Sequence, residues 1–180
     1  MNFQGLKKVE EADFYLDKAI RKSKTMVERL RGKIKSDRLS KSRQIEIERI
    51  NSITSYLKED LKKIVESFPK ISELPKFYEE LVRCTLDLAA LKKSLASLNW
   101  ASDQVNRLCI LYRSKIKRTG DLQKINSYRR QFFGRIGSVT RQVAGSLVNI
   151  EEARRIMRKF PTIKTGTKSV VLMGFPNVGK

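Results

Sequence analysis

The sequence has 180 residues, of which 40% are hydrophobic and 32% charged, a composition typical of a folded domain rather than a disordered tail. It contains 39 Lys and Arg against 19 Asp and Glu, and the resulting formal charge of +20 favours a polyanionic partner, with nucleic acid first and an acidic membrane surface second. The absence of histidine, together with only two cysteines, excludes a His/Cys zinc site and a histidine base. No signal peptide and no apolar run of membrane-spanning length is present, so we expect a cytoplasmic protein.

Hydrophobic residues at spacings of three and four predict two amphipathic helices in the first 68 residues. The first runs from about residue 9 to residue 31, and Gly32 is a suitable end. A connector rich in lysine and serine follows at 33–42. The second helix stops before Pro69. Its inward stripe consists of Ile50, Ile53, Leu57, Leu61, Ile64 and Phe68.

Helical periodicity is most regular between residues 76 and 118, after Pro75. The heptad-like stripe consists of Phe77, Leu81, Cys84, Leu88, Leu91, Leu95 and Leu98. The pattern leaves open whether this region is one helix or two with a kink at Asn99–Trp100. It also allows a dimerisation coiled coil, but neighbouring amphipathic helices favour packing within a monomeric bundle. We expect Trp100 to pack and Cys84 and Cys109 to be buried free thiols.

The turn 119–121 leads into one long predicted helix, 121–159, which Pro161 ends. Its inward stripe consists of Ile125, Tyr128, Phe132, Ile136, Val139, Val143, Leu147 and Ile150. Gly134, Gly137 and Gly145 lie on the opposite side with two arginines. Because glycine inside a helix costs up to about 1 kcal/mol relative to alanine, we expect something to approach the backbone on that side.

Basic residues are concentrated in the same part of the chain. Residues 101–160 carry 14 basic and 4 acidic side chains, whereas residues 51–100 carry 8 and 7. This segregation favours an RNA-binding face over a merely solvated helix face, although a solvated face is the simpler alternative. The candidate RNA-binding residues are Arg129, Arg130, Arg135, Arg141, Arg155 and Lys159. Phe133 is the aromatic residue expected to be free to stack on bases, since the inward stripe assigns Tyr112, Tyr128 and Phe132 to the core.

The last residues follow the pattern of a phosphate-binding loop. After a linker at 161–167, an apolar strand at 168–173 leads into Gly174, Phe175, Pro176, Asn177, Val178, Gly179 and Lys180. In a G-x4-G-K loop, backbone N–H groups surround the phosphates and the lysine reaches the β- and γ-phosphates. The serine or threonine that holds magnesium would follow Lys180, so we assign no metal ligand in this sequence.

Taken in order, these elements predict a mainly α protein. We expect an antiparallel bundle of long helices over residues 1–160, then the linker, then the first strand and P-loop of an α/β nucleotide-binding domain over 168–180. Only the beginning of that second domain is present, so we expect this chain alone to hold no nucleotide and to hydrolyse none.

Several stretches of the sequence are similar to the nucleolar G-protein family of Obg-related GTPases and its archaeal relatives. They are Phe68–Lys70, Pro75–Leu81, Arg129–Arg135, Arg155–Ile163 and the loop Gly174–Lys180. The resemblance implies a large-ribosomal-subunit assembly factor whose helical bundle contacts ribosomal RNA and whose next domain binds and hydrolyses GTP with magnesium. It also implies a nucleolar location if the protein is eukaryotic. The guanine-specifying Asn-Lys-x-Asp motif is absent, so guanine specificity rests on the resemblance.

Two other functions remain open. The bundle could be a protein-interaction or regulatory module attached to a P-loop NTPase, with its charge serving only solubility. An acidic-membrane binder would need a wide apolar face beside its lysines, but the apolar stripes here are needed to build the bundle. We therefore expect no membrane partner.

Overall fold

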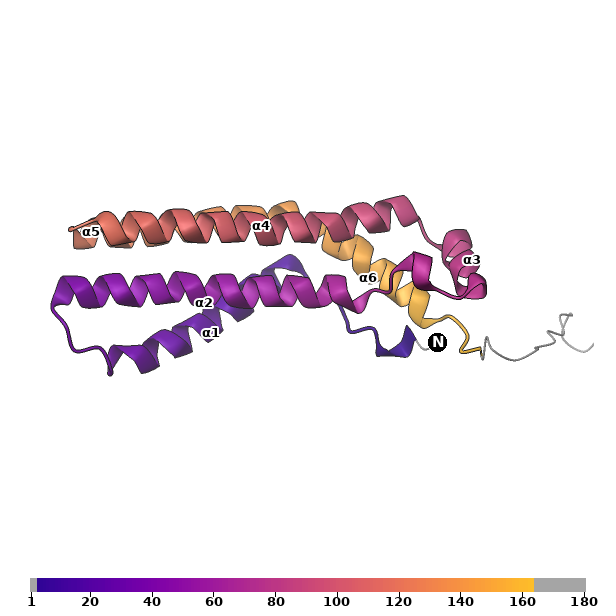
Figure 1. Cartoon of the computed structure of the whole chain (residues 1–180), viewed down its shortest axis with the longest axis horizontal. Coiled ribbons are helices and arrows are strands. Elements are labelled where there is room, and N and C mark those ends of the chain that lie inside the picture. Colours follow the sequence, from indigo (N-terminus) through magenta and orange to yellow (C-terminus); the bar gives the residue numbers. More distant parts are fainter. Residues whose placement is uncertain (1–2, 164–180) are drawn as a thin grey trace, which may run out of the picture.

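The computed structural model describes residues 3–163, which form an elongated helical bundle (Figure 1). The elements, in chain order, are the 3-10 helix η1 (Phe3–Gly5), α1 (Ala12–Arg31), α2 (Arg38–Ser67), the 3-10 helix η2 (Ile71–Glu73), α3 (Lys76–Thr85), α4 (Leu88–Arg118), α5 (Leu122–Gln142) and α6 (Ala144–Arg158). The predicted helical bundle is thereby confirmed. The expected strand at 168–173, and the linker beyond residue 163, lie outside the described residues.

Three long helices lie side by side along the molecule. α2 packs against α4, α4 packs against α5, and α1 lies across α2 and α5. The connection between α1 and α2 and the turn between α4 and α5 lie at one end of the bundle (Figure 1). The N-terminal segment, α3 and the end of α6 lie at the other end, where the described chain stops.

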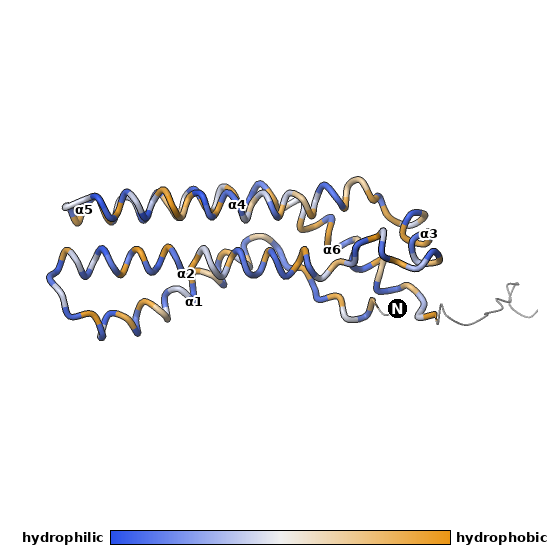
Figure 2. The backbone as a smooth tube through the Cα atoms, viewed as in Figure 1, coloured by the Kyte–Doolittle hydropathy of each residue, from blue (hydrophilic) through white to orange (hydrophobic). Residues whose placement is uncertain are grey.

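The inward faces of the helices supply one continuous core. Along each helix, hydrophobic and hydrophilic residues alternate with the helical period (Figure 2). The α2 stripe is buried as predicted, with Ile50 and Ile53 fully inaccessible, and in α5 Phe132 and Ile136 are equally inaccessible. Burial of each such side chain contributes about 1.5–3 kcal/mol, so the core is the main reason why these amphipathic segments form helices.

Three aspartates define where the long helices begin. Asp37 accepts a hydrogen bond from the Ser40 N–H at 3.0 Å, and Asp121 accepts one from the Gln123 N–H at 2.7 Å. Asp87 does the same for the Ala90 N–H at 2.9 Å. Such caps satisfy N–H groups that the first turn of a helix leaves free, and each contributes about 1 kcal/mol.

The region 76–118 contains two helices, and the break lies at Leu86–Asp87 rather than at Asn99–Trp100. Leu86 is extended, with φ −126° and ψ 142°, and Asp87 then caps α4. The single heptad-like stripe was therefore wrong across the junction, because α3 buries a different face from the one predicted.

The corrected face of α3 consists of Tyr78 and Val82, both fully buried, whereas Phe77 is 43% exposed. Cys84 is exposed, which contradicts the prediction of a buried thiol, while Cys109 is buried as expected. In α4, Trp100 is 42% exposed, so the expectation that it packs was also wrong.

The predicted helix 121–159 is interrupted at Val143, which separates α5 from α6. Val143 has φ −100° and ψ 5°, and its N–H bonds to the Thr140 carbonyl three residues back at 3.3 Å. The Thr140 hydroxyl donates to the Ile136 carbonyl at 3.0 Å, a back-bond that bends helices. The break redirects α6, which packs on α4 and on η1.

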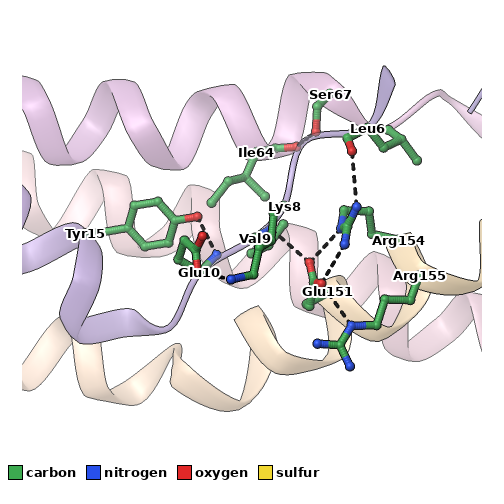
Figure 3. A network of polar contacts seen from close by, with 10 residues as sticks. All are labelled: Leu6, Lys8, Val9, Glu10, Tyr15, Ile64, Ser67, Glu151, Arg154 and Arg155. Atoms are coloured by element: carbon green, nitrogen blue, oxygen red, sulfur yellow. Dashed lines mark hydrogen bonds and ion pairs between the residues drawn. The ribbon is translucent and has the colours of Figure 1, made fainter. Parts of the chain in front are cut away.

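A buried carboxylate connects α6 to the N-terminal segment (Figure 3). Glu151 accepts hydrogen bonds from Arg154 Nε and Nη2, both at 2.7 Å, and from the Val9 N–H at 2.9 Å. Arg154 also donates to the Leu6 carbonyl at 3.3 Å. Arg155 Nε reaches the outer side of the same carboxylate at 3.0 Å. These bonds hold residues 6–9 against α6.

Replacing Glu151 by Gln should lower the free energy of unfolding at neutral pH by about 3 kcal/mol, because Arg154 would remain buried without its counter-charge. The hydrogen bonds from Arg154, followed by those from Val9 and Arg155, lower the pKa of Glu151 from its ordinary value to about 2. A lowered carboxylate pKa stabilises the folded state above the unfolded pKa, and this contribution is lost as the pH falls from about 5 to about 2. Urea unfolding at several pH values measures both effects, and the variant should show a flatter acid limb.

Arg155→Gln is the matched control, because the Arg155 side chain is 66% exposed and its ion pair is screened by water. We expect a loss below about 1 kcal/mol. Equal losses in the two variants would contradict the role assigned to the buried pair.

Candidate nucleic-acid interface

The predicted RNA-binding cations fall into two groups in the structure. Arg130, Arg135, Arg141 and Lys159 are exposed, and none of the four forms an ion pair within residues 3–163. In the described part of the chain, Arg141 donates only to a carbonyl of its own helix, that of Gly137, at 3.3 Å. These four side chains are therefore available to an external anion.

Arg129 belongs to the second group, because it neutralises a buried acid. Its Nη1 atom lies 3.2 Å from Glu46 Oε1, and Arg49 Nε lies 3.0 Å from Glu46 Oε2. Glu46 is only 4% exposed, so this carboxylate depends on the two arginines for its counter-charge. Arg155 likewise pairs with Glu151, although most of its side chain faces solvent. Both arginines thus have structural partners, of which the sequence spacing indicates Glu151 for Arg155, at i,i+4, but not Glu46 for Arg129.

The exposed arginines do not form one continuous face. At 100° per residue, Arg130 and Arg141 share the outer ridge of α5 and are about 16 Å apart along its axis. Arg135 lies on the flank of α5. The break at Val143 places Arg155 on α6, which runs in another direction, and Lys159 at the C-cap of α6 (Figure 1). The structure therefore brings together only Arg130 and Arg141 of the predicted set.

The three glycines predicted to lie beside these arginines are more open than expected, and Gly145 belongs to α6 rather than to α5. A Cβ atom at Gly134 or Gly145 would meet no atom within 4 Å, and one at Gly137 would lie 3.9 Å from Leu16 Cδ2 of α1. Among residues 3–163, the only approach to these three glycines is thus an ordinary van der Waals contact at Gly137. Packing within residues 3–163 gives no reason for glycine at 134 or 145.

Aromatic side chains near the ridge are mostly committed to the core. Tyr112 and Phe132 are buried and meet edge to face, with ring centroids 5.9 Å apart. Tyr128 is half-buried beside Lys115, whose Nζ lies 5.7 Å from the ring centroid. Phe133 is also half-buried and packs against the core, so it is less free to stack on a base than predicted.

The described residues form neither a metal-binding cluster nor a membrane-spanning helix. No group of three or more His, Cys, Asp or Glu within residues 3–163 is placed to hold a metal ion. None of the described helices is long and apolar enough to cross a membrane. The predicted nucleotide-binding residues, Gly174 to Lys180, lie outside the described part of the chain.

Comparison with known protein families matches residues 3–164 to the NOG1 N-terminal helical domain. The chain belongs to this family. The match covers the whole bundle, from η1 to the end of α6, so the family assignment rests on the helical domain itself and not on the loop at 174–180.

Curated relatives of this family member come from archaea and eukaryotes. An uncharacterized protein of Methanocaldococcus jannaschii is 30% identical over 99% of the chain and 50% of its own length. Nucleolar GTP-binding protein 1 of Drosophila melanogaster is 26% identical over 93% of the chain and 25% of its own length. The protein of the same name from Caenorhabditis elegans is 27% identical over 95% and 24%, respectively. The chain thus spans half or less of the relatives it matches.

Gly134→Ala should raise the free energy of unfolding by about 0.5–1 kcal/mol, because alanine favours the helix and its Cβ would meet no neighbour. Urea unfolding of the variant beside the parent chain measures the change. Gly137→Ala is the control in contact with α1, and its gain should be no larger. A loss of stability at Gly134 would show that α5 is not a regular helix at this position.

Proposed function

We propose that this bundle is the RNA-binding N-terminal domain of a GTP-binding protein that acts in assembly of the large ribosomal subunit. The parent protein would bind and hydrolyse GTP in the domain that begins at residue 168. The bundle would dock on ribosomal RNA of the subunit precursor, and the GTPase domain would time binding and release.

The nucleotide-binding part of this proposal draws on the loop pattern and on the names of the relatives. Gly174 to Lys180 follow the G-x4-G-K spacing after an apolar run, and the backbone N–H groups with Lys180 would hold the phosphates of GTP. Magnesium, held by the residue after Lys180, would offset the phosphate charge. Several relatives are named nucleolar GTP-binding proteins, and the chain spans about a quarter of their length.

The RNA-binding part rests on one observation. Arg130, Arg135 and Arg141 stand exposed on α5 without an acidic partner among the described residues, in a chain whose formal charge is +20. Unpaired guanidinium groups bind phosphate oxygens without first breaking an internal ion pair, and they release counterions from the nucleic acid. A partner with a dense phosphate backbone fits this surface.

A protein-interaction module is the second candidate, and exposed apolar residues on α4 favour it. Trp100, Ile110 and Leu111 are between 42% and 60% exposed, although α4 elsewhere contributes to the core. Tryptophan is enriched among residues that dominate protein interfaces. Such an interface would depend little on salt, whereas phosphate contacts weaken steeply as salt rises.

Titration of the 180-residue chain against fragments of large-subunit ribosomal RNA, from low to physiological salt, tests the proposal. We expect binding that survives an excess of unrelated duplex RNA and a log–log salt plot with a steep negative slope. If excess unrelated duplex RNA abolishes the binding, the positive charge acts only as a generic polyanion-binding surface.

Replacing Arg130 and Arg141 together by Glu should weaken RNA binding several-fold and leave the bundle folded, because both side chains are exposed and have no acidic partner among the described residues. Circular dichroism establishes folding, and the RNA titration gives the affinity. Unchanged affinity in a folded variant would show that the α5 ridge is not the contact face, while RNA binding by the parent chain would stand.

A further inference from the structure

Two connections that are far apart in sequence meet at one end of the bundle (Figure 1). One is the segment between α1 and α2, and the other is the turn between α4 and α5. Arg43, near the start of α2, ties this end together, because its Nη2 atom donates to the Thr119 carbonyl in the α4–α5 turn at 2.8 Å. We call residues 28–43 together with residues 113–124 the bundle tip.

The bundle tip carries a large share of the charge. It contains twelve basic and three acidic residues, so its formal charge is +9 out of the chain's +20, although it holds less than a sixth of the residues. The exposed basic residues of the tip are Arg29, Arg31, Lys33, Lys35, Arg38, Lys117, Arg118 and Lys124. This concentration was not evident from the sequence, because the two segments are separated by about 70 residues.

Few acids oppose these cations. The carboxylates of Asp37 and Asp121 accept hydrogen bonds from backbone N–H groups in the first turns of α2 and α5. The hydrogen bonds from Ser40 lower the pKa of Asp37 below its ordinary value. Every ion pair found among residues 3–163 lies outside the bundle tip. Outside the tip, some cations are paired, as in Lys18–Asp60 at 2.8 Å and Arg83–Glu79 at 2.7 Å.

The chemistry of the bundle tip fits phosphate better than protein. Lysine is depleted in the cores of protein interfaces, and yet half of the twelve basic residues here are lysines. An RNA backbone presents closely spaced phosphates that several flexible ammonium and guanidinium groups can meet at once. The tip also lies at the end of the bundle away from α3 and the end of α6, so a contact there would leave the exit of the chain accessible (Figure 1).

We infer that the bundle tip, rather than the α5 ridge, is the principal RNA-binding surface, and that it grips the phosphate backbone of folded ribosomal RNA through both connections. This inference rests on the proposed function, because it names the part of the bundle that carries the RNA affinity. Arg130 and Arg141 then extend the same contact along α5.

Three triple variants of the 180-residue chain test this surface at equal charge. The tip variant is Lys33→Glu, Lys35→Glu and Arg118→Glu. The ridge variant is Arg130→Glu and Arg141→Glu with Arg135→Glu on the flank of α5, which is added to keep the charge equal. The control is Lys76→Glu, Lys92→Glu and Lys93→Glu. Each lowers the formal charge from +20 to +14 and changes only exposed side chains. A fourth variant carries Gln at the three tip positions. It removes the same positive charges without adding negative ones, so it controls for misfolding caused by charge reversal.

In titrations against large-subunit ribosomal RNA fragments, the tip variant should bind about tenfold or more weakly than the control. The magnitude of its slope of log affinity against log salt concentration should be smaller by about two to three. The glutamine variant should lose less in the same direction. The ridge variant should lie between the tip variant and the control.

Other outcomes separate failure of the tip from failure of the proposed function. Equal losses of RNA affinity in the tip and control variants, or a larger loss in the ridge variant, would contradict the assignment of the bundle tip as the principal RNA-binding surface. RNA binding by the domain would still stand. Displacement of the RNA by polyglutamate at matched charge would also contradict this assignment, by indicating an acidic-protein or generic polyanion surface. Absence of competitor-resistant binding by the unmodified chain would overturn the proposed function itself.

Discussion

The buried Glu151 carboxylate determines how the two ends of the domain come together. A carboxylate removed from water is unfavourable unless ion pairs and hydrogen bonds replace its hydration. Here Arg154 and the Val9 N–H provide that replacement from opposite ends of the chain. The N-terminal segment therefore lies against α6, and the packing at this end of the bundle follows from that contact.

The same end holds the chain where it leaves the bundle. Phe3 meets Tyr78 and Phe160 edge to face, with ring centroids 5.3 and 5.6 Å apart. The Tyr78 hydroxyl accepts from the Ile163 N–H at 2.8 Å and donates to the Pro161 carbonyl at 3.0 Å. The direction in which the chain leaves α6 thus depends on α3 and on residues near the N-terminus. These contacts therefore set the position from which the chain continues after residue 163.

The distribution of charge is a consequence of how the fold uses its acids. Glu46 and Glu151 are buried among arginines, and Asp37, Asp87 and Asp121 cap helices. Acids committed to internal partners leave the surface cations at the bundle tip unopposed. The excess positive charge of the tip comes from its composition, twelve basic against three acidic residues, and the fold brings the two basic connections to one end of the bundle.

Sequence periodicity determined the helical class and the buried face of α2, and separate motif stretches carried the family resemblance. Both kinds of signal are local, so they can be recognised without the tertiary structure. Periodicity misplaced the boundaries in 76–118 and 121–159, since the Asp87 cap and the Thr140 back-bond compete with helix continuation without any proline. The basic face could be predicted only in part. Contacts between residues about 80 positions apart decide two features of this face. They decide which arginines are paired internally, as Arg129 is with Glu46. They also decide which distant connections lie at the same end, as the bond from Arg43 to Thr119 shows. Only the tertiary structure decides these, because the pairing energy of a charge depends on its burial and on its neighbours in space.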